Sequence, residues 1–368
     1  MHADRRRLRN LSVLISVHLC PIPSTCGTFF VTSFWKWTTE QQIQKYRSPE
    51  RASSGKPRRV TERFLRYRIT IAITPKTGVL RVVDEYLAAL KKGKNGFVVK
   101  DRKSRLPFLE KHGHRLRLRM EGQARPTEYE IGLNYAIASQ PLYPPHYPHI
   151  VAFREEVSGW QFYYFEPRRM REENPVKEVY RLMSDGGDLA AFYHTLKLTN
   201  PLQFDNIQRT LRMIVPTVEA IDVELTKEGK VRLAIREHGV EFSAKVISEG
   251  TLRILGLLAI LSPNNPATTI GFEEPENGVH PRRLKLIADL LKNASRKKQI
   301  IVNSHSPLLP DYLPGWTDVL LVGCRKAHGA SVFEPLYEAI GLFRKRMVEM
   351  ALEEKTPISQ RILRGDWE

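Results

Sequence analysis

Cysteine is scarce in this chain, and long apolar runs are missing from it. The three cysteines, Cys20, Cys26 and Cys324, have a spacing that fits neither a disulfide framework nor a set of metal ligands. The longest apolar stretches, such as residues 255–261, fall far short of the roughly 20 residues that a membrane-spanning helix needs. These shortages argue against a disulfide-stabilised secreted scaffold and against an integral helical membrane protein. They favour a reducing compartment, the cytoplasm.

Acidic residues are also outnumbered, because 58 Lys and Arg stand against 40 Asp and Glu, for a net charge of +18. Such an excess favours anionic partners, nucleic acid first, and the alternative is a solvated basic arm. Residues 1–67 show neither helical nor strand periodicity, which predicts a basic extension that is disordered or mis-translated. Residues 5–19 resemble the start of a signal peptide, but Ser and His interrupt the apolar part, so export is the lesser alternative.

From residue 68 onward, apolar periodicity predicts regular elements up to residue 323. They are a strand at 67–73, a helix at 78–90, strands at 128–138 and 160–165, helices at 176–195 (broken at 185–187) and 203–215, and a three-stranded meander between 218 and 246, followed by helix 249–261, strand 268–273, helix 281–294, strand 299–303, helix 306–312 and strand 318–323. Alternation of apolar strands with helices predicts an α/β fold with a parallel sheet flanked by helices. We expect one domain over residues 68–335, with an antiparallel β portion and a helical insertion at about 168–215, and a helical tail at 336–368.

Two carboxylates, Glu273 and Glu274, follow the buried strand 268–273. Strands of an open α/β sheet present side chains in a crevice at their carboxyl ends. There Glu273 can hold Mg²⁺, which prefers oxygen ligands, and Glu274 can polarise an attacking water. A pair of surface acids at a strand end is the alternative, and the Pro275–Gly278 turn that follows favours the chemical interpretation.

Two further polar groups stand at similar junctions. Ser248 and Gly250 begin a predicted helix, whose free N–H groups suit a phosphate; taken by itself, Ser248 is better explained as a plain helix cap. His305 follows strand 299–303 and could donate to a γ-phosphate oxygen; a histidine satisfied in a turn is the alternative. The three sets together suit phosphoryl transfer better than any one of them alone.

The segments Ser248–Arg253, Ile270–His280 and Val302–Pro307 resemble the signature, Walker B and switch motifs of predicted AAA/ABC-type ATPases related to RecF and SMC proteins. The resemblance covers residues from about 160 to 323. It implies an ABC-type P-loop NTPase-like fold that binds ATP and Mg²⁺. It also implies roles for individual residues: Glu273 on the Mg²⁺ side, Glu274 as general base, His305 as switch histidine, Asn277 and Gly278 in the D-loop, and Ser248 and Gly250 acting on ATP held by a second subunit.

The family's Walker A loop, G-x-x-x-x-G-K-[ST], does not occur in the sequence. The nearest segment is Thr74–Thr77, after a predicted strand and before a predicted helix, where Lys76 and Thr77 take the places of the phosphate-binding Lys and the Mg²⁺-binding hydroxyl. Thr70 and Pro75 replace the two glycines, and proline has no N–H to offer a phosphate. Either ATP binding has been lost, or the reading frame upstream of about residue 78 is damaged. A coincidental Lys-Thr pair is the alternative to a phosphate-binding role for Lys76 and Thr77.

The sequence therefore predicts a cytoplasmic ATPase that acts as a nucleotide-driven switch and forms a homodimer when ATP binds. By family analogy it serves DNA maintenance or defence against foreign DNA, with DNA and a separate effector protein as further partners. The alternative function is that of a binding or scaffold protein, an ATPase-fold remnant that lacks Walker A.

Overall fold

The computed structural model describes residues 27–29, 60–62, 64–74, 77–93, 96–101, 103–143, 146–263, 265–312, 322–327, 330–335, 357, 359–360 and 363. The chain divides into two compact units. Unit 1 comprises Met1–Ser158 and Val322–Pro335, and unit 2 comprises Gly159–Leu321 and Leu336–Glu368. Most of the predicted extension and of the predicted tail lie outside the described residues. The domain expected over 68–335 differs from this division, because its first ninety or so residues, 68–158, belong to unit 1.

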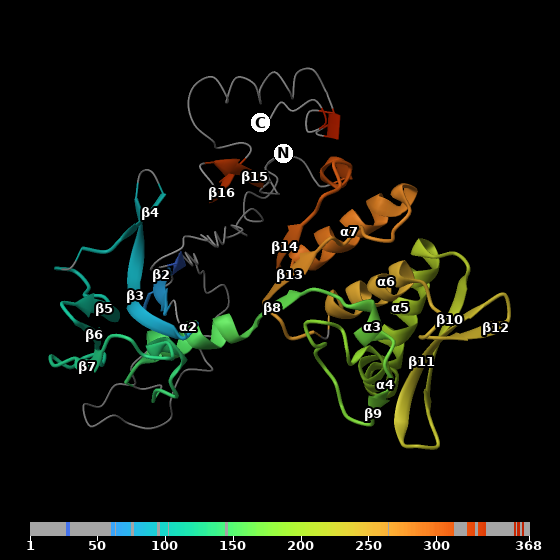
Figure 1. The fold of residues 1–368 in the computed structure, drawn as a ribbon, viewed down its shortest axis with the longest axis horizontal. Coiled ribbons are helices and arrows are strands. Elements are labelled where there is room, and N and C mark those ends of the chain that lie inside the picture. Colours follow the sequence, from blue (N-terminus) through green and yellow to red (C-terminus); the bar gives the residue numbers. More distant parts are fainter. Residues whose placement is uncertain are drawn as a thin grey trace, which may run out of the picture. The chain divides into compact units, whose positions relative to one another are not determined.

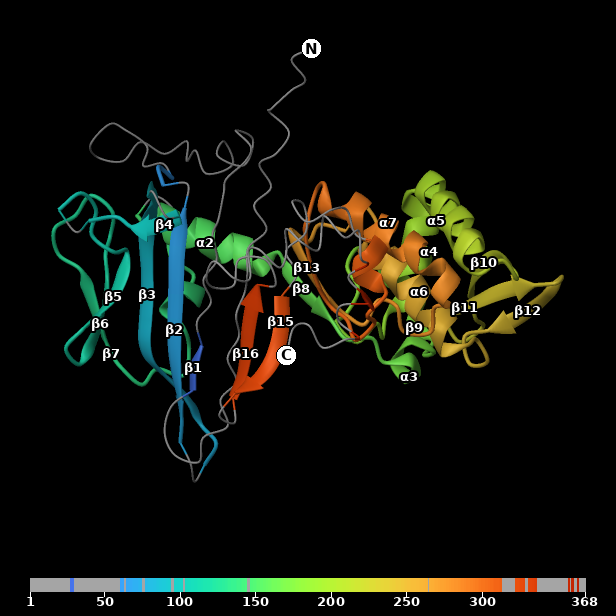
Figure 2. The ribbon, with the colours of Figure 1, turned by 90° about the horizontal axis from the view of Figure 1, so that it is seen from above.

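Unit 1 is built around an antiparallel sheet in which the long strands β2 and β3 lie side by side (Figures 1 and 2). The elements are β1 (Gly27–Phe29), β2 (Leu65–Ile73), β3 (Leu80–Gly93), β4 (Gly96–Val99), β5 (Leu109–His112), β6 (Arg115–Leu118), β7 (Thr127–Glu130), the short helix η1 (Ile137–Ser139) and α2 (Pro148–Ser158), with the hairpin β15 (Val322–Ala327) and β16 (Ala330–Pro335). Leu65, Leu87, Leu109 and Leu116 are fully buried in its core together with Ile150 of α2. Strand β7 ends at Glu130, so the strand expected at 128–138 is much shorter than predicted.

The helix expected at 78–90 is wrong: residues 80–90 belong to strand β3, paired antiparallel with β2. The register shifts between Thr70 and Ile71, so that Thr70 faces Asp84 while Ile71 faces Val82, with one extra β3 residue between them. A bulge of this kind interrupts the alternation of a strand. Apolar residues therefore stand at Leu80, Val83, Tyr86, Leu87 and Leu90, a spacing typical of a helix, although the backbone is a strand.

Glu85 is a buried carboxylate in the core of unit 1. Its two oxygens accept hydrogen bonds from the Tyr67 hydroxyl (2.9 Å) and from the backbone N–H groups of Ile137 (2.6 Å) and Ala138 (3.0 Å). Burial raises the pKa of Glu85 above its usual range, although the two backbone hydrogen bonds oppose the shift. The side chain thus holds the start of η1 against the long hairpin.

Unit 2 contains a parallel sheet of β8 (Trp160–Tyr163), β13 (Thr269–Glu273) and β14 (Gln299–Asn303), in the order β14-β13-β8. A separate antiparallel sheet consists of β10 (Val218–Leu225), β11 (Lys230–Glu237) and β12 (Val240–Ser243), with β9 (Asn174–Pro175) beside β11. The helices are α3 (Pro167–Met170), α4 (Leu189–Thr199), α5 (Pro201–Ile214), α6 (Glu249–Ile260) and α7 (Leu284–Ser295), with the short helices η2 (Pro281–Arg283) and η3 (Leu309–Tyr312). The α/β class, the parallel sheet, the meander and a helical segment within 168–215 are as predicted; the helix expected at 176–195 begins only at Leu189.

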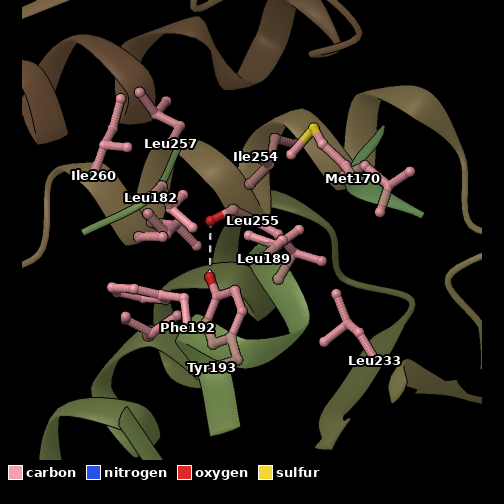
Figure 3. Close-up of a cluster of buried hydrophobic side chains, with 14 of the residues drawn as sticks. Met170, Leu182, Leu189, Phe192, Tyr193, Leu233, Ile254, Leu255, Leu257 and Ile260 are labelled. Atoms are coloured by element: carbon pink, nitrogen blue, oxygen red, sulfur yellow. Dashed lines mark hydrogen bonds between the residues drawn. The ribbon is translucent and has the colours of Figure 1, made fainter. Parts of the chain in front are cut away.

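The core of unit 2 lies between α4, α5 and α6 and the strands beside them (Figures 1 and 3). Ile270 and Phe272 of β13 are buried in this core, as are Leu252 and Leu255 of α6 and Ile287 of α7. The buried Tyr193 hydroxyl donates to the carbonyl oxygen of Leu255 at 2.8 Å within this core, joining α4 to α6 (Figure 3). The core therefore holds α6 and β13 in one fixed arrangement, and the polar ends of both elements follow from it.

Candidate functional site

The candidate site begins where β13 and β14 end. These strands are parallel and Glu273 is paired in register with Asn303, so both chains leave the sheet at the same edge. The Glu274 N–H donates to the Asn303 carbonyl oxygen at 2.7 Å. Glu274 has a φ of +49°, a left-handed conformation that is uncommon for residues other than glycine. This conformation turns the chain sharply after the sheet and directs Glu274 toward the loop that follows β14.

Glu274 and His305 lie next to each other, because the strands that they follow, β13 and β14, are paired. His305 Nε2 is 3.7 Å from Glu274 Oε1, and the Asn277 side-chain amide donates to Glu274 Oε2 at 3.2 Å. The imidazole is 81% exposed and the Glu274 side chain 39% exposed. Solvent can therefore reach both groups. A small molecule bound at the surface could contact the two side chains at once.

Ser248 is the N-cap of α6. Its Oγ accepts the N–H of Thr251 at 3.1 Å and lies 2.8 Å from the Thr251 hydroxyl. The cap that the sequence offered as an alternative is thus present. It does not compete with the predicted phosphate contact, since Ser248 is exposed and its hydroxyl retains lone pairs.

Gly250 and Gly278 bring the start of α6 into backbone contact with the turn after β13. A Cβ atom added to Gly250 would lie 2.4 Å from the Gly278 carbonyl oxygen, and one added to Gly278 would lie 2.3 Å from the Gly250 Cα. Gly278 also has a φ of +79°. Both glycines are therefore required by the close approach of two backbones. The signature-like and D-loop-like segments predicted from sequence meet here within one chain.

Glu276 belongs to the same site, and the sequence reasoning missed it. Its Oε1 accepts the Ser304 hydroxyl at 2.6 Å and the Ser306 N–H at 3.2 Å, so it joins the turn after β13 to the loop after β14. Its Oε2 is buried and has no hydrogen-bond partner among the described residues. The one available signal was a third carboxylate in the Glu273–Gly278 turn, and residue type alone did not show which way it points.

The side chain of Glu273 is exposed at the end of β13 and, among the described residues, makes no hydrogen bond or ion pair. One free carboxylate at a strand end fits Mg²⁺, which keeps most of its ligands as water. In the part of the chain that the structure describes, no group of three or more His, Cys, Asp or Glu side chains is arranged to hold a metal ion. The residues present therefore fit a hydrated Mg²⁺ that arrives with phosphate, and do not form a closed metal cage.

The sequence placed Lys76 and Thr77 in a loop before a helix, and the structure has a strand in place of that helix. Lys76 lies outside the described residues. Thr77 is in the tight turn of the β2–β3 hairpin, where its N–H and that of Gly78 both donate to the Thr74 carbonyl oxygen. A strand follows this turn, so it has no helix N-terminus with free N–H groups to receive a phosphate. Thr77 also belongs to unit 1, whereas the residues described above belong to unit 2.

Residues 145–311 match the sequence model of a family described as "AAA domain, putative AbiEii toxin, Type IV TA system". The match spans less than half of the chain, and it includes the two motif segments after β13 and β14 and the start of α6. No curated protein matches the chain. The similarity in sequence thus falls almost wholly on unit 2.

Solved structures that resemble this chain include heads of SMC proteins. The SMC head domain from Thermotoga maritima is 14% identical over 69% of this chain and 74% of that chain, with a TM-score of 0.32. An SmcHead bound to the C-winged helix domain of ScpA is 11% identical over 78% of each chain, with a TM-score of 0.40. The Smc head domain with a coiled coil and joint from Pyrococcus yayanosii is 20% identical over 43% of this chain and 31% of that chain, with a TM-score of 0.33. TM-scores below 0.5 do not establish a common fold. In the described residues, no helix is both long and apolar enough to cross a membrane.

Proposed function

We propose that this protein is an ATPase of the AAA/ABC type that binds and hydrolyses ATP with Mg²⁺. The observation that carries the proposal is the placement of Glu274 and His305 at 3.7 Å from each other, after two adjacent parallel strands, beside the unpartnered Glu273. The match of residues 145–311 to an AAA domain supports it. The carboxyl edge of a parallel sheet is also where α/β proteins bind their ligands.

In this proposal each group has one task. Glu273 holds Mg²⁺ through water, and the cation, when bound, neutralises charge on the phosphates. Glu274 accepts a proton from the attacking water, and Asn277 orients its carboxylate by donating to Oε2. His305 donates to an oxygen of the γ-phosphate. Ser248 and Gly250 offer a hydroxyl and the start of a helix to the ATP of a second subunit.

The wider role follows as part of the proposal. ATP held between two copies drives dimerisation, and hydrolysis separates them, so the protein works as a switch. We propose that the switch serves DNA maintenance or anti-phage defence in the cytoplasm, with DNA and a separate effector protein as partners. The net charge of +18 supports an anionic partner.

One observation favours a second function: residues 80–93 form a strand, and not the helix that follows a phosphate-binding loop. The sequence has no G-x-x-x-x-G-K-[ST] loop, and the nearest segment, residues 74–77, is followed by strand β3. An ATPase fold that has lost its phosphate loop can persist as a binding or scaffold protein. The two functions differ in affinity for nucleotide. Calorimetric titration with Mg-ATP separates them: micromolar binding supports the ATPase, and absence of binding supports the scaffold.

Turnover should depend on Glu274. Glu274→Gln keeps the shape of the side chain and its contact with Asn277, but it cannot take a proton. We expect an unchanged affinity for Mg-ATP and a turnover lower by roughly 10²- to 10⁴-fold, the share expected of a general base. Glu224→Gln, on the exposed edge of the antiparallel sheet, is the matched control and should leave turnover unchanged. Equal rates in Glu274→Gln and its parent would contradict the role of Glu274.

Dimerisation should depend on Ser248. In a full-length Glu274→Gln background, which holds ATP without hydrolysing it, sedimentation with Mg-ATP should show a dimer, and sedimentation without nucleotide a monomer. Adding Ser248→Arg places a bulky guanidinium at the phosphate contact and should abolish the ATP-dependent dimer. Ser248 is exposed, so the monomer should stay folded by circular dichroism. A dimer that survives Ser248→Arg would refute the shared site.

A further inference from the structure

We infer that Glu276 is a positioning residue: its carboxylate clamps the loop after β14 to the turn after β13 and thereby sets His305 against Glu274. The catalytic meaning of this inference rests on the proposed ATPase function. The clamp itself rests only on the contacts described above.

Glu276 holds both neighbours of His305 through one oxygen. Oε1 accepts the Ser304 hydroxyl at 2.6 Å and the Ser306 N–H at 3.2 Å, and the same N–H lies 3.1 Å from Ser304 Oγ. His305 stands between these two serines in the chain. The position of its backbone is therefore set from both sides by a side chain of the neighbouring turn.

His305 has little else to hold it in place. Its side chain is 81% exposed and lies 3.7 Å from Glu274. Such an exposed pair favours the positioned imidazole over a free one by less than about fivefold. Hydrogen bonds to a charged carboxylate contribute about tenfold or more. The clamp at Glu276 is thus the stronger determinant of where the imidazole lies. The hydrogen bond from the Glu274 N–H to the Asn303 carbonyl oxygen fixes the chain only up to Asn303, the residue before Ser304, where the contacts of Glu276 start.

The second oxygen of Glu276 makes the inference testable. Oε2 is buried without a hydrogen-bond partner among the described residues, so the contacts to the loop use Oε1 alone. Glutamine can place its carbonyl oxygen where Oε1 lies and keep both contacts, although its buried NH₂ group then lacks an acceptor. Aspartate keeps the charge but is one methylene too short to reach the serines. A positioning role therefore predicts that Gln retains more function than Asp, and a direct role of the charge predicts the reverse.

The first measurement is hydrogen exchange of the Ser306 amide in the full chain without nucleotide. We expect Glu276→Ala and Glu276→Asp to raise its exchange rate about 10- to 100-fold, the value of the lost charged hydrogen bond. Glu276→Gln should raise it less. Glu224→Ala, which removes an exposed carboxylate paired with Arg232, serves as the control and should leave Ser306 unchanged.

The second measurement is turnover in the same variants. In Ala and Asp variants kcat should fall while KM for ATP stays within about twofold, because the clamp acts on the geometry of His305 and not on nucleotide affinity. Glu276→Gln should retain most of kcat. This split between kcat and KM separates positioning from a loss of folding. Unfolding would lower the protection from exchange across unit 2 and would also weaken the binding of ATP.

Each result has a definite meaning. Unchanged exchange at Ser306 in Glu276→Ala overturns the clamp. Loss in Gln with retention in Asp shows that the charge acts directly, and this also overturns the inference. If the parent has no turnover, the proposed ATPase fails while exchange still decides the clamp. If exchange rises in the Ala variant and an active parent's kcat is unaffected by it, the clamp does not serve the reaction.

Discussion

Replacing Gly278 with alanine tests the closest contact of the candidate site. Two costs are expected. A residue with a side chain at a φ of +79° is strained by about 1–2 kcal/mol. The new Cβ would also lie 2.3 Å from the Gly250 Cα, a contact that requires one backbone segment to move, and such overpacking costs about 1–3 kcal/mol. The sum is a loss of about 2–5 kcal/mol in the stability of unit 2.

Gly229→Ala is the matched control for this substitution. Gly229 lies in the β10–β11 turn with a φ of +70°, and a Cβ added there meets no atom within 4 Å. Both variants therefore carry the strain of a positive φ, and only Gly278→Ala carries the contact. The difference between the two, about 1–3 kcal/mol, isolates the approach of the two backbones.

Unit 2 must be followed by itself, because a chain of two units need not unfold in one step. Hydrogen exchange of the α6 amides over a urea series reports the unit directly. The contact alone corresponds to a fall in melting temperature of about 2–12 °C, at 2–4 °C per kcal/mol for a unit of this size. Gly278→Ala and Gly229→Ala agreeing within about 0.5 kcal/mol would refute the contact between the start of α6 and the turn after β13.

Two further predictions concern buried polar groups. Burial raises the pKa of Glu85, so its contribution to stability is complete below the unfolded pKa of about 4.3 and is lost as pH rises through the folded pKa. The unfolding free energy of the parent should therefore fall with rising pH relative to Glu85→Gln, by at most about 1.4 kcal/mol per pH unit, and urea titrations that stay parallel across pH would contradict this. Tyr193→Phe removes the donor to the Leu255 carbonyl oxygen and should cost about 1–3 kcal/mol in urea unfolding of unit 2, whereas Tyr180→Phe, at an exposed hydroxyl, should cost less than about 0.5 kcal/mol.

The elements between 218 and 303 could be predicted closely because their patterns are unbroken. Strands β10, β11 and β13 are short runs of apolar or alternating residues, and α6 begins with a capping serine. Local propensity and tertiary packing agree there, so a pattern is enough. In β3 they disagree. The bulge opposite Thr70 shifts the buried face by one residue, and pairing with β2 decides for a strand.

Residue types and their order determined which groups could act at the candidate site: two carboxylates after one apolar strand, a histidine after the next, and a serine with a glycine at a helix start. Because parallel strands end at a common edge, chain order alone predicted that Glu274 and His305 would lie on the same edge of the sheet. Only the tertiary structure decided that Glu276 faces the Ser304–Ser306 loop and that Gly250 contacts Gly278. These contacts depend on the left-handed turn at Glu274 and on how the start of α6 meets the turn after β13. Both arise from long-range packing, which leaves no periodic pattern in the sequence.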